Sequence, residues 1–250
     1  MAKRIAAART GDEEPSPQAV RTALREVIGR CLYGVDINPM SAELCRVSLW
    51  LEALEPGKPL SFLDHHIRVG NSLLGATPEL IAKGIPDDAF EPIEGDDKKL
   101  CSGFKKRNKS ERQGHQDMFY QMGAEPQTEY LALSDQVAGI DVVEDSSSVK
   151  IHEKESRFST LQKSNEYQHA KLVCDAWCAA FVWKKTKDFP YPITEQVFLQ
   201  LKSNPSQCPD WLLAEIRRLA DSFRFFHWHL AFPAVFGADG KGGFDVVLGN

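Results

Sequence analysis

The first residue with clear chemical potential is an acid that follows a short apolar run. Residues 32–35 (Leu-Tyr-Gly-Val) read as a buried strand, Asp36 stands at its carboxyl end, and Asn38-Pro39 opens a helix. A carboxylate in this position can accept hydrogen bonds from both hydroxyls of a ribose, as nucleoside-containing cofactors require. It could instead form an Asx turn or cap the helix. Asn38 already provides an N-cap, so Asp36 is our first candidate for a cofactor contact.

A second polar cluster follows the next short predicted strand, Ile67–Val69. Gly70 permits a close approach of the backbone, and the amide of Asn71 offers both a donor and an acceptor to a base edge. Ligands of parallel sheets lie beyond the carboxyl ends of the strands, so this cluster would lie beside Asp36 if the two strands are neighbours. A plain Gly-Asn turn is the alternative.

Four further groups of residues are of types that could form sites. Residues 98–112 carry seven Lys and Arg side chains, which are either solvated surface or phosphate contacts, with Lys105, Lys106, Arg107 and Lys109 as the DNA-contact candidates. The adjacent His65 and His66 are expected to be loop residues. Cys174 and Cys178, one helical turn apart, are expected to pack in a helix. Neither pair is expected to bind a metal. His227 and His229 alternate with apolar residues and are expected to be exposed on one face of an extended segment.

The secondary-structure elements that must position these residues predict an α/β fold with a helical insertion. Leu44, Val47, Leu51 and Leu54 recur at helical spacing and are expected to pack on the sheet. Residues 77–148 are expected to form loops and short helices, followed by helices within 150–183, 193–201 and 209–223. Residues 244–250 (Phe-Asp-Val-Val-Leu-Gly-Asn) read as a final hydrophobic strand. The predicted division is an α/β part at 1–76, a helical insertion at 77–223, and a return to the sheet at 224–250.

Composition sets wide bounds. The chain has 250 residues, 42% hydrophobic and 26% charged, with a net charge of −5. These values are ordinary for a soluble globular protein and do not exclude a local basic surface for nucleic acid. Six cysteines without a CxxC pair, no apolar run of membrane-spanning length and no signal-peptide core indicate a cytoplasmic protein.

Four segments together resemble the amino-methylating DNA methyltransferases, specifically the adenine-N6 type. They read YGVDINPMSAELCRVSLWLEAL, IRVGNSLLG, FHWHLAFPAVF and FDVVLGN. The likeness is strongest to the large single-chain enzymes of bacterial restriction–modification and bacteriophage-exclusion systems, and it covers residues 17–76 and 223–250 well. The resemblance implies a partial Rossmann-like S-adenosylmethionine-dependent methyltransferase fold that acts on double-stranded DNA, with other defence-system subunits as possible partners.

The resemblance also implies roles for individual residues. Asp36 would bind the ribose of S-adenosylmethionine, Ile37 would pack on its adenine ring, and Asn71 with Ser72 would read that adenine. Asn250 would be the first residue of the family's Asn-Pro-Pro-aromatic motif and would accept a hydrogen bond from the amino group of the target adenine. The target base must leave the duplex to reach it.

The departures from the family lead to further expectations. The glycine-rich loop that holds the methionine end of the cofactor would precede Met1, and the Pro-Pro-aromatic residues would follow Asn250. The chain therefore reads as a fragment, and we expect it to be inactive alone and to bind S-adenosylmethionine weakly or not at all. Two other readings stay open: a fragment of an NAD-dependent oxidoreductase, although no GxGxxG is present, and a non-catalytic DNA-binding or scaffold piece using residues 98–112.

Overall fold

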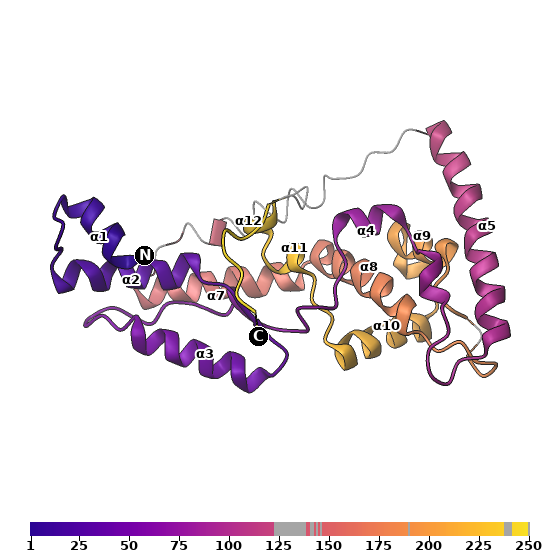
Figure 1. The fold of residues 1–250 in the computed structure, drawn as a ribbon, viewed down its shortest axis with the longest axis horizontal. Helices are drawn as coiled ribbons and strands as arrows, with labels where there is room; N and C mark the ends of the chain where they lie inside the picture. The colour runs from indigo at the N-terminus through magenta and orange to yellow at the C-terminus, as the bar shows by residue number, and fades with distance from the viewer. Residues whose placement is uncertain are drawn as a thin grey trace. The chain divides into compact units, whose positions relative to one another are not determined.

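The computed structural model describes residues 1–122, 139–140, 143, 145, 147–189, 191–237 and 242–249 (Figure 1), with the side chains of 115–122 outside this description. The chain forms two compact units. The first comprises Met1–Gly70 and Ser134–Lys163, and the second comprises Asn71–Leu133 and Ser164–Asn250. The division into 1–76, 77–223 and 224–250 stays a prediction. No helix among the described residues is long and apolar enough to span a membrane.

The first unit begins with two helices that pack together, α1 (Ala2–Thr10) and α2 (Pro17–Cys31). The hydroxyl of Ser16 caps α2 by accepting a hydrogen bond from the Ala19 amide at 3.3 Å, with Pro17 in the first turn. The Arg9 guanidinium forms a 2.6 Å ion pair with Glu26 and lowers the pKa of that carboxyl. These local signals explain why α2 forms.

A small parallel sheet follows. Strands β1 (Gly34–Asp36) and β2 (Ile67–Val69) pair in parallel, with Gly34 opposite Ile67 and Asp36 opposite Val69. Helix α3 (Pro39–Glu52) connects them and contacts both. The two predicted strands are therefore neighbours, as expected, and the mixed α/β character of the chain is confirmed.

The face of α3 that packs on the strands is not the predicted one. The core of this unit contains Ile28, Ala42, Ala53, Leu63 and Ile67, with Leu24, Leu49 and Trp50 at its border. The expected packing residues are exposed, as their relative exposures show: Leu44 59%, Val47 44%, Leu51 70% and Leu54 57%. Small alanines and the buried stem of Arg46, which donates to the Ile67 carbonyl at 2.9 Å, let α3 approach the sheet closely. The prediction for these four residues was wrong.

Helix α7 (Ser148–Lys163) covers another side of the first unit. Its Phe158 ring lies 5.8 Å from that of Phe62, and the Arg68 guanidinium stands 5.0 Å from the Phe158 centroid. The adjacent pair His65-His66 lies in a turn, as expected, but both side chains are buried. Their rings contact each other with centroids 4.1 Å apart.

In the part of the second unit that the structure describes, helices dominate. They are α4 (Pro78–Lys83), η1 (Asp87–Phe90), α5 (Lys98–Met122), α8 (Asn165–Val182), α9 (Glu195–Ser203), η2 (Pro205–Gln207), α10 (Asp210–Phe223), α11 (Trp228–Ala231) and α12 (Pro233–Phe236). The buried helix α8 contacts α4, η1, α9, α10 and α11 (Figure 1). The predicted helices within 150–183, 193–201 and 209–223 are confirmed, with Ser164 separating α7 from α8 by capping the latter.

Three local predictions in this unit were wrong. The 25-residue helix α5 replaces the expected loops and short helices, because Asp97 caps it by accepting from the Lys99 amide at 2.8 Å and Arg107 pairs with Glu111 one turn later at 2.6 Å. Residues 228–231 and 233–236 form α11 and α12, where an extended segment was expected. Residues 244–249 form no strand, and Leu248 is 92% exposed, because a strand needs a hydrogen-bonding neighbour.

Candidate functional site

The turn after β1 is built from its own residues. Asp36 Oδ1 accepts a hydrogen bond from the Asn38 amide at 2.7 Å, and Asn38 Oδ1 accepts one from the Met40 amide at 3.0 Å. Asp36 thus makes the Asx turn that was the alternative to a cofactor contact. Its side chain is therefore part of the turn. Its Oδ2 accepts no hydrogen bond from any residue that the structure describes, and the side chain is exposed. The carboxylate can therefore hold the turn and bind a ligand hydroxyl at once.

The residues next to Asp36 leave space for a flat apolar group. Ile37 is 53% exposed at the same turn. The Gly70 amide donates to the Asp36 carbonyl at 2.9 Å, which fixes the carboxyl ends of β1 and β2 side by side. An exposed carboxylate oxygen beside an exposed branched apolar side chain suits a nucleoside, whose ribose is polar and whose base is flat.

The turn after β2 opens the second unit and is held by residues far along the chain. The Asn71 amide donates to the Arg224 carbonyl at 2.7 Å, and the Phe226 amide donates to the Leu74 carbonyl at 2.7 Å. Asn71 and Phe225 form a parallel bridge. Within the turn, Asn71 Oδ1 accepts from the Leu73 amide at 3.1 Å.

Two side chains from the same distant segment complete this arrangement. Trp228 Nε1 donates to the Ser72 carbonyl at 3.0 Å, and the Ala76 amide donates to His227 Nδ1 at 3.1 Å. Gly75 packs so closely here that a Cβ would lie 2.0 Å from the Phe226 carbonyl oxygen. Sequence reasoning missed this partnership. Its only signal was the density of aromatic and histidine residues at 225–236.

The two histidines of that segment are buried, not exposed as predicted. His227 Nε2 forms a 2.9 Å hydrogen bond with Asp175 Oδ1, and Lys171 Nζ pairs with Asp175 Oδ2 at 2.6 Å. Burial lowers the pKa of His229 to about 4, and the neighbouring His227 adds to this effect. Helical folding of α11 removes the strand alternation on which the predicted exposure rested.

The predicted catalytic residue, Asn250, lies outside the described residues. Asp36 and Ile37 belong to the first unit, and Asn71 and Ser72 belong to the second. The convergence of Asp36, Asn71 and Asn250 on one crevice therefore stays a prediction.

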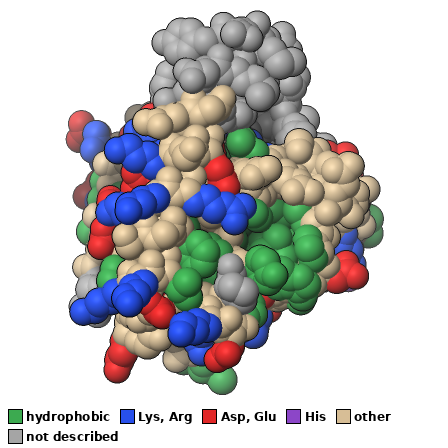
Figure 2. All heavy atoms as spheres, turned by 90° about the vertical axis from the view of Figure 1, so that its right-hand side faces the viewer, with side chains coloured by type: hydrophobic (Ala, Val, Ile, Leu, Met, Phe, Trp, Pro, Cys, Tyr) green, Lys and Arg blue, Asp and Glu red, His purple; other side chains and the backbone are tan. Residues whose placement is uncertain are grey.

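The predicted DNA-contact residues lie on α5, and the structure divides them into two kinds. Lys105 pairs with Glu91 at 2.5 Å, which raises the pKa of the lysine, and Arg107 pairs with Glu111. Lys106 and Lys109 are exposed and have no ion-pair partner in the part of the chain described here. Figure 2 shows Lys and Arg side chains interspersed with acidic ones beside a hydrophobic patch. A phosphate can approach an unpaired lysine without displacing a carboxylate, so Lys106 and Lys109 are the stronger candidates, and the DNA contact stays a prediction.

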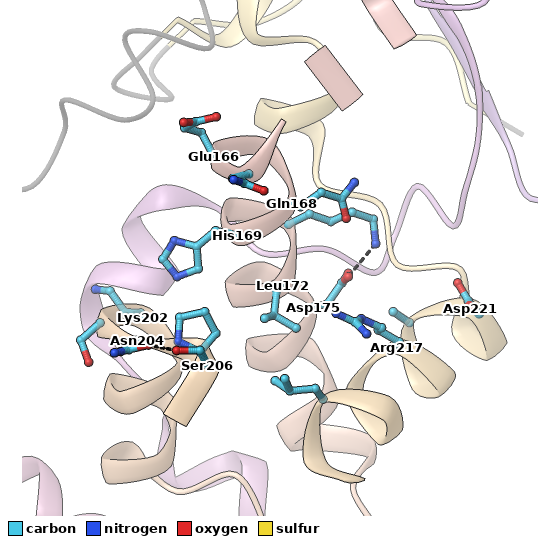
Figure 3. Close-up of a pocket in the computed structure, with 16 residues that line it drawn as sticks. Glu166, Gln168, His169, Leu172, Asp175, Lys202, Asn204, Ser206, Arg217 and Asp221 are labelled. Carbon is cyan, nitrogen blue, oxygen red and sulfur yellow. Dashed lines mark hydrogen bonds and ion pairs between the residues drawn. The ribbon is translucent and has the colours of Figure 1, made fainter. Parts of the chain in front are cut away.

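The second unit also contains a polar groove of about 820 Å³ between α8, α9, η2 and α10 (Figure 3). Arg217, Lys202 and His169 line it, and Asp175 with Lys171 forms part of its wall. Its cations are matched by Glu166, Asp175 and Asp221, so the groove is not strongly basic. Among the described residues, no three His, Cys, Asp or Glu side chains gather as a metal site.

Comparison with known proteins identifies the family. Residues 30–250 match the Eco57I restriction-modification methylase family. The chain belongs to this family. The match supports a restriction-modification DNA methyltransferase and not an oxidoreductase fragment or a non-catalytic scaffold. No curated protein and no solved structure matches the chain.

Proposed function

We propose that this member of the family transfers a methyl group from S-adenosylmethionine to the N6 atom of adenine in DNA, in bacterial restriction–modification or phage defence. The observation that supports this best is the exposed Oδ2 of Asp36 at the joined carboxyl ends of β1 and β2. In a parallel sheet this edge is where nucleoside cofactors bind. S-adenosylmethionine supplies a methyl group on a cationic sulfur when it is bound.

The proposed cofactor contacts are side chains of the two turns, and the geometry within each turn supports them separately. Asp36 Oδ2 accepts hydrogen bonds from the ribose hydroxyls, while Oδ1 keeps the turn closed through the Asn38 amide. Ile37 packs on the adenine ring. Asn71 Oδ1 retains a second lone pair beyond its bond with the Leu73 amide, which an adenine amino group can use. Ser72 lies next to it in the same turn.

The proposed catalytic step rests on Asn250. Its side-chain oxygen accepts a hydrogen bond from the amino group of an extruded adenine. Partial withdrawal of that hydrogen makes the nitrogen lone pair a better nucleophile toward the methyl group. S-adenosylmethionine, when bound, would supply the methyl group that replaces one hydrogen of this amino group, and the released proton would pass to solvent.

The proposed DNA contact uses the basic side of α5. Lys106 and Lys109, with the neighbouring Lys105 and Arg107, neutralise backbone phosphates without reading sequence. Replacing both Lys106 and Lys109 with Gln is expected to weaken DNA binding and to reduce the slope of log affinity against log salt by about 2. The matched control replaces Arg157 and Arg218 with Gln, which removes two ion-paired cations from other helices and is expected to leave the slope near wild type. Equal slopes for all the variants would remove α5 from the DNA contact.

The proposed reaction is tested with the product of the native gene. Duplex DNA is incubated with methyl-labelled S-adenosylmethionine and digested to nucleosides, and we expect the label in N6-methyladenine. Asp36→Ala is expected to lower methylation at limiting cofactor by about tenfold or more, since a hydrogen bond to a charged group contributes roughly 1.5–3 kcal/mol. Glu94→Ala, an exposed acid elsewhere, should have no effect. Label in methylcytosine, or no label in any nucleoside, would contradict the proposal.

A further inference from the structure

The turn Asn71–Ala76 is connected to the interior of α8 by a continuous chain of hydrogen bonds. The Ala76 amide donates to His227 Nδ1 at 3.1 Å, and His227 Nε2 donates to Asp175 Oδ1 at 2.9 Å. The other carboxylate oxygen of Asp175 pairs with Lys171 Nζ at 2.6 Å. Figure 3 shows the last of these contacts at the wall of the groove. Asp175 and His227 have almost no exposed side-chain surface.

The donors and acceptors in this chain determine one protonation pattern. Because Nδ1 of His227 receives the Ala76 N–H, it must carry a lone pair, so the ring proton sits on Nε2. Nε2 then requires an acceptor, and Asp175 provides it. Asp175 thereby orients the imidazole ring, and the ring in turn holds the backbone of Ala76. Without the carboxylate, nothing in this chain of contacts would keep Nδ1 directed at Ala76.

The segment Asn71–Ala76 contains the residues that are proposed to contact the adenine of the cofactor. At the start of the segment it is held by the backbone bonds with Arg224 and Phe226 and by the Trp228–Ser72 bond. At its far end, after the close packing of Gly75, the Ala76 amide is held by His227, and the Ala76 backbone also forms a hydrogen bond with His229. The position of the Asn71 amide relative to a bound base depends on both ends.

We propose that Asp175 and His227 are positioning residues for methyl transfer: through the Ala76 amide they set the place of the Asn71–Ser72 turn and hence the affinity for the nucleoside end of the cofactor. Neither side chain touches the reacting atoms. This inference rests on the proposed function, in which Asn71 and Ser72 contact the adenine of S-adenosylmethionine.

The test uses the native gene product and three aspartate variants. Asp175→Ala removes the acceptor, and we expect it to raise the KM for S-adenosylmethionine about tenfold, because small misplacements of a contact residue carry costs of this size or more. The kcat and the KM for DNA should change less than threefold. Asp175→Asn keeps an amide oxygen for His227 and should restore the KM to within threefold of wild type. Asp96→Ala is the matched control, since this buried carboxylate in the same unit binds Lys185 instead.

A second readout does not depend on the cofactor. In the unliganded protein, the Ala76 amide should exchange hydrogen faster in Asp175→Ala than in wild type or Asp175→Asn. Faster exchange with an unchanged KM would overturn the positioning role and leave the proposed function intact. A wild-type protein that methylates no DNA would instead refute the proposed function on which this role rests.

Equal KM changes in Asp175→Ala and Asp96→Ala would also overturn the proposal, because a general loss of packing would explain both. If Asp175→Ala does not fold, His227→Asn tests the same link. Its shorter side chain can still accept from Ala76 but cannot reach Asp175, so we expect the KM for the cofactor to rise and the KM for DNA to stay near wild type. A wild-type KM for the cofactor in a folded His227→Asn variant would contradict the proposal.

Discussion

The turns after β1 and β2 each begin with an Asx residue and are stabilised in different ways. In each, an Asx side chain accepts from the amide two residues later: Asp36 from Asn38 at 2.7 Å and Asn71 from Leu73 at 3.1 Å. The first turn needs little else, because Asn38 caps the next helix. The second turn is also held by the segment 224–228, about 150 residues further along the chain.

This difference has consequences for stability and for function. A turn built from neighbouring residues forms at a small entropic cost, whereas contacts across a long loop must offset the entropy of closing it. The first turn should therefore persist when distant packing is disturbed. The second should respond to changes in α8, α10 and α11. The following predictions test this contrast, beginning with the largest effect.

The largest effect is expected at Gly75. Gly75→Ala places a Cβ 2.0 Å from the Phe226 carbonyl oxygen, so the pairing of the two segments must shift. We expect a loss of roughly 3 kcal/mol in the unfolding free energy of the second unit. Urea unfolding followed by tryptophan fluorescence reports this unit, which holds four of the five tryptophans.

A helical glycine in the same unit serves as the control for Gly75. A Cβ at Gly103 in α5 would meet nothing within 4 Å. Gly103→Ala should therefore raise stability by about 0.5–1 kcal/mol through helix propensity. If Gly75→Ala unfolds at the wild-type urea concentration, the tight pairing of this turn with residues 224–228 is wrong.

Acid should weaken the second turn and spare the first. Burial lowers the pKa of His229 to about 4, with a contribution from His227, while a hydrogen bond with the Ala76 backbone opposes the shift. Between pH 6.5 and 4 the unfolded chain takes up a proton that the folded protein does not bind. Stability should therefore fall across this window by about 3 kcal/mol, since one pKa unit corresponds to about 1.4 kcal/mol.

Unfolding measured from pH 7 to pH 4 tests the acid effect. His229→Gln removes the titrating group, and its stability profile should be flatter by the same amount. Amide exchange at residues 36–40 should show no matching change. A His229→Gln profile parallel to wild type would contradict the assignment of this window to His229.

A smaller effect is expected at the helix cap of the first turn. Asn38→Ala removes the acceptor for the Met40 amide and should cost about 1 kcal/mol. Asn38→Asp keeps that acceptor and should be close to wild type. Hydrogen exchange in α3 measures the change, and exchange at residues 71–76 should stay the same. Matched losses in both turns would show that the first turn is not independent.

The smallest stability effect is expected at Asn71. Asn71→Ala removes only the side-chain bond to the Leu73 amide, and the backbone bonds with Arg224 and Phe226 remain. We expect a loss of about 0.5 kcal/mol, at the low end for one exposed hydrogen bond. Thermal or urea unfolding checks this value, and a loss as large as that of Gly75→Ala would mean that the side chain itself holds the turn.

Local features could be predicted from the sequence. Ser16-Pro17 and Asn38-Pro39 mark the starts of α2 and α3 because the capping groups and the helix they cap are neighbours. The strand ends at Asp36 and Val69 follow from short apolar runs closed by polar residues. The resemblance to restriction-modification DNA methyltransferases was confirmed, because it depends on segments that are contiguous in the sequence.

Contacts between distant segments could not be predicted. Periodicity gives α3 two apolar faces and does not say which one meets the strands, so Leu44 and Leu51 were assigned to the wrong side. The alternation of His227 and His229 fits a strand, but their burial depends on Asp175 in α8. The many charged residues of α5 leave it without a clear apolar periodicity. Its helix is stabilised instead by the Asp97 cap and by paired side chains.

The most direct test of the account is hydrogen exchange on the native gene product with and without S-adenosylmethionine. Both turns are proposed to contact one cofactor, although one turn is self-contained and the other depends on distant residues. We predict slower exchange at residues 36–40 and at residues 71–76 on addition of the cofactor, with the same concentration dependence. Protection of only one turn, or of neither while DNA is methylated, would contradict the account.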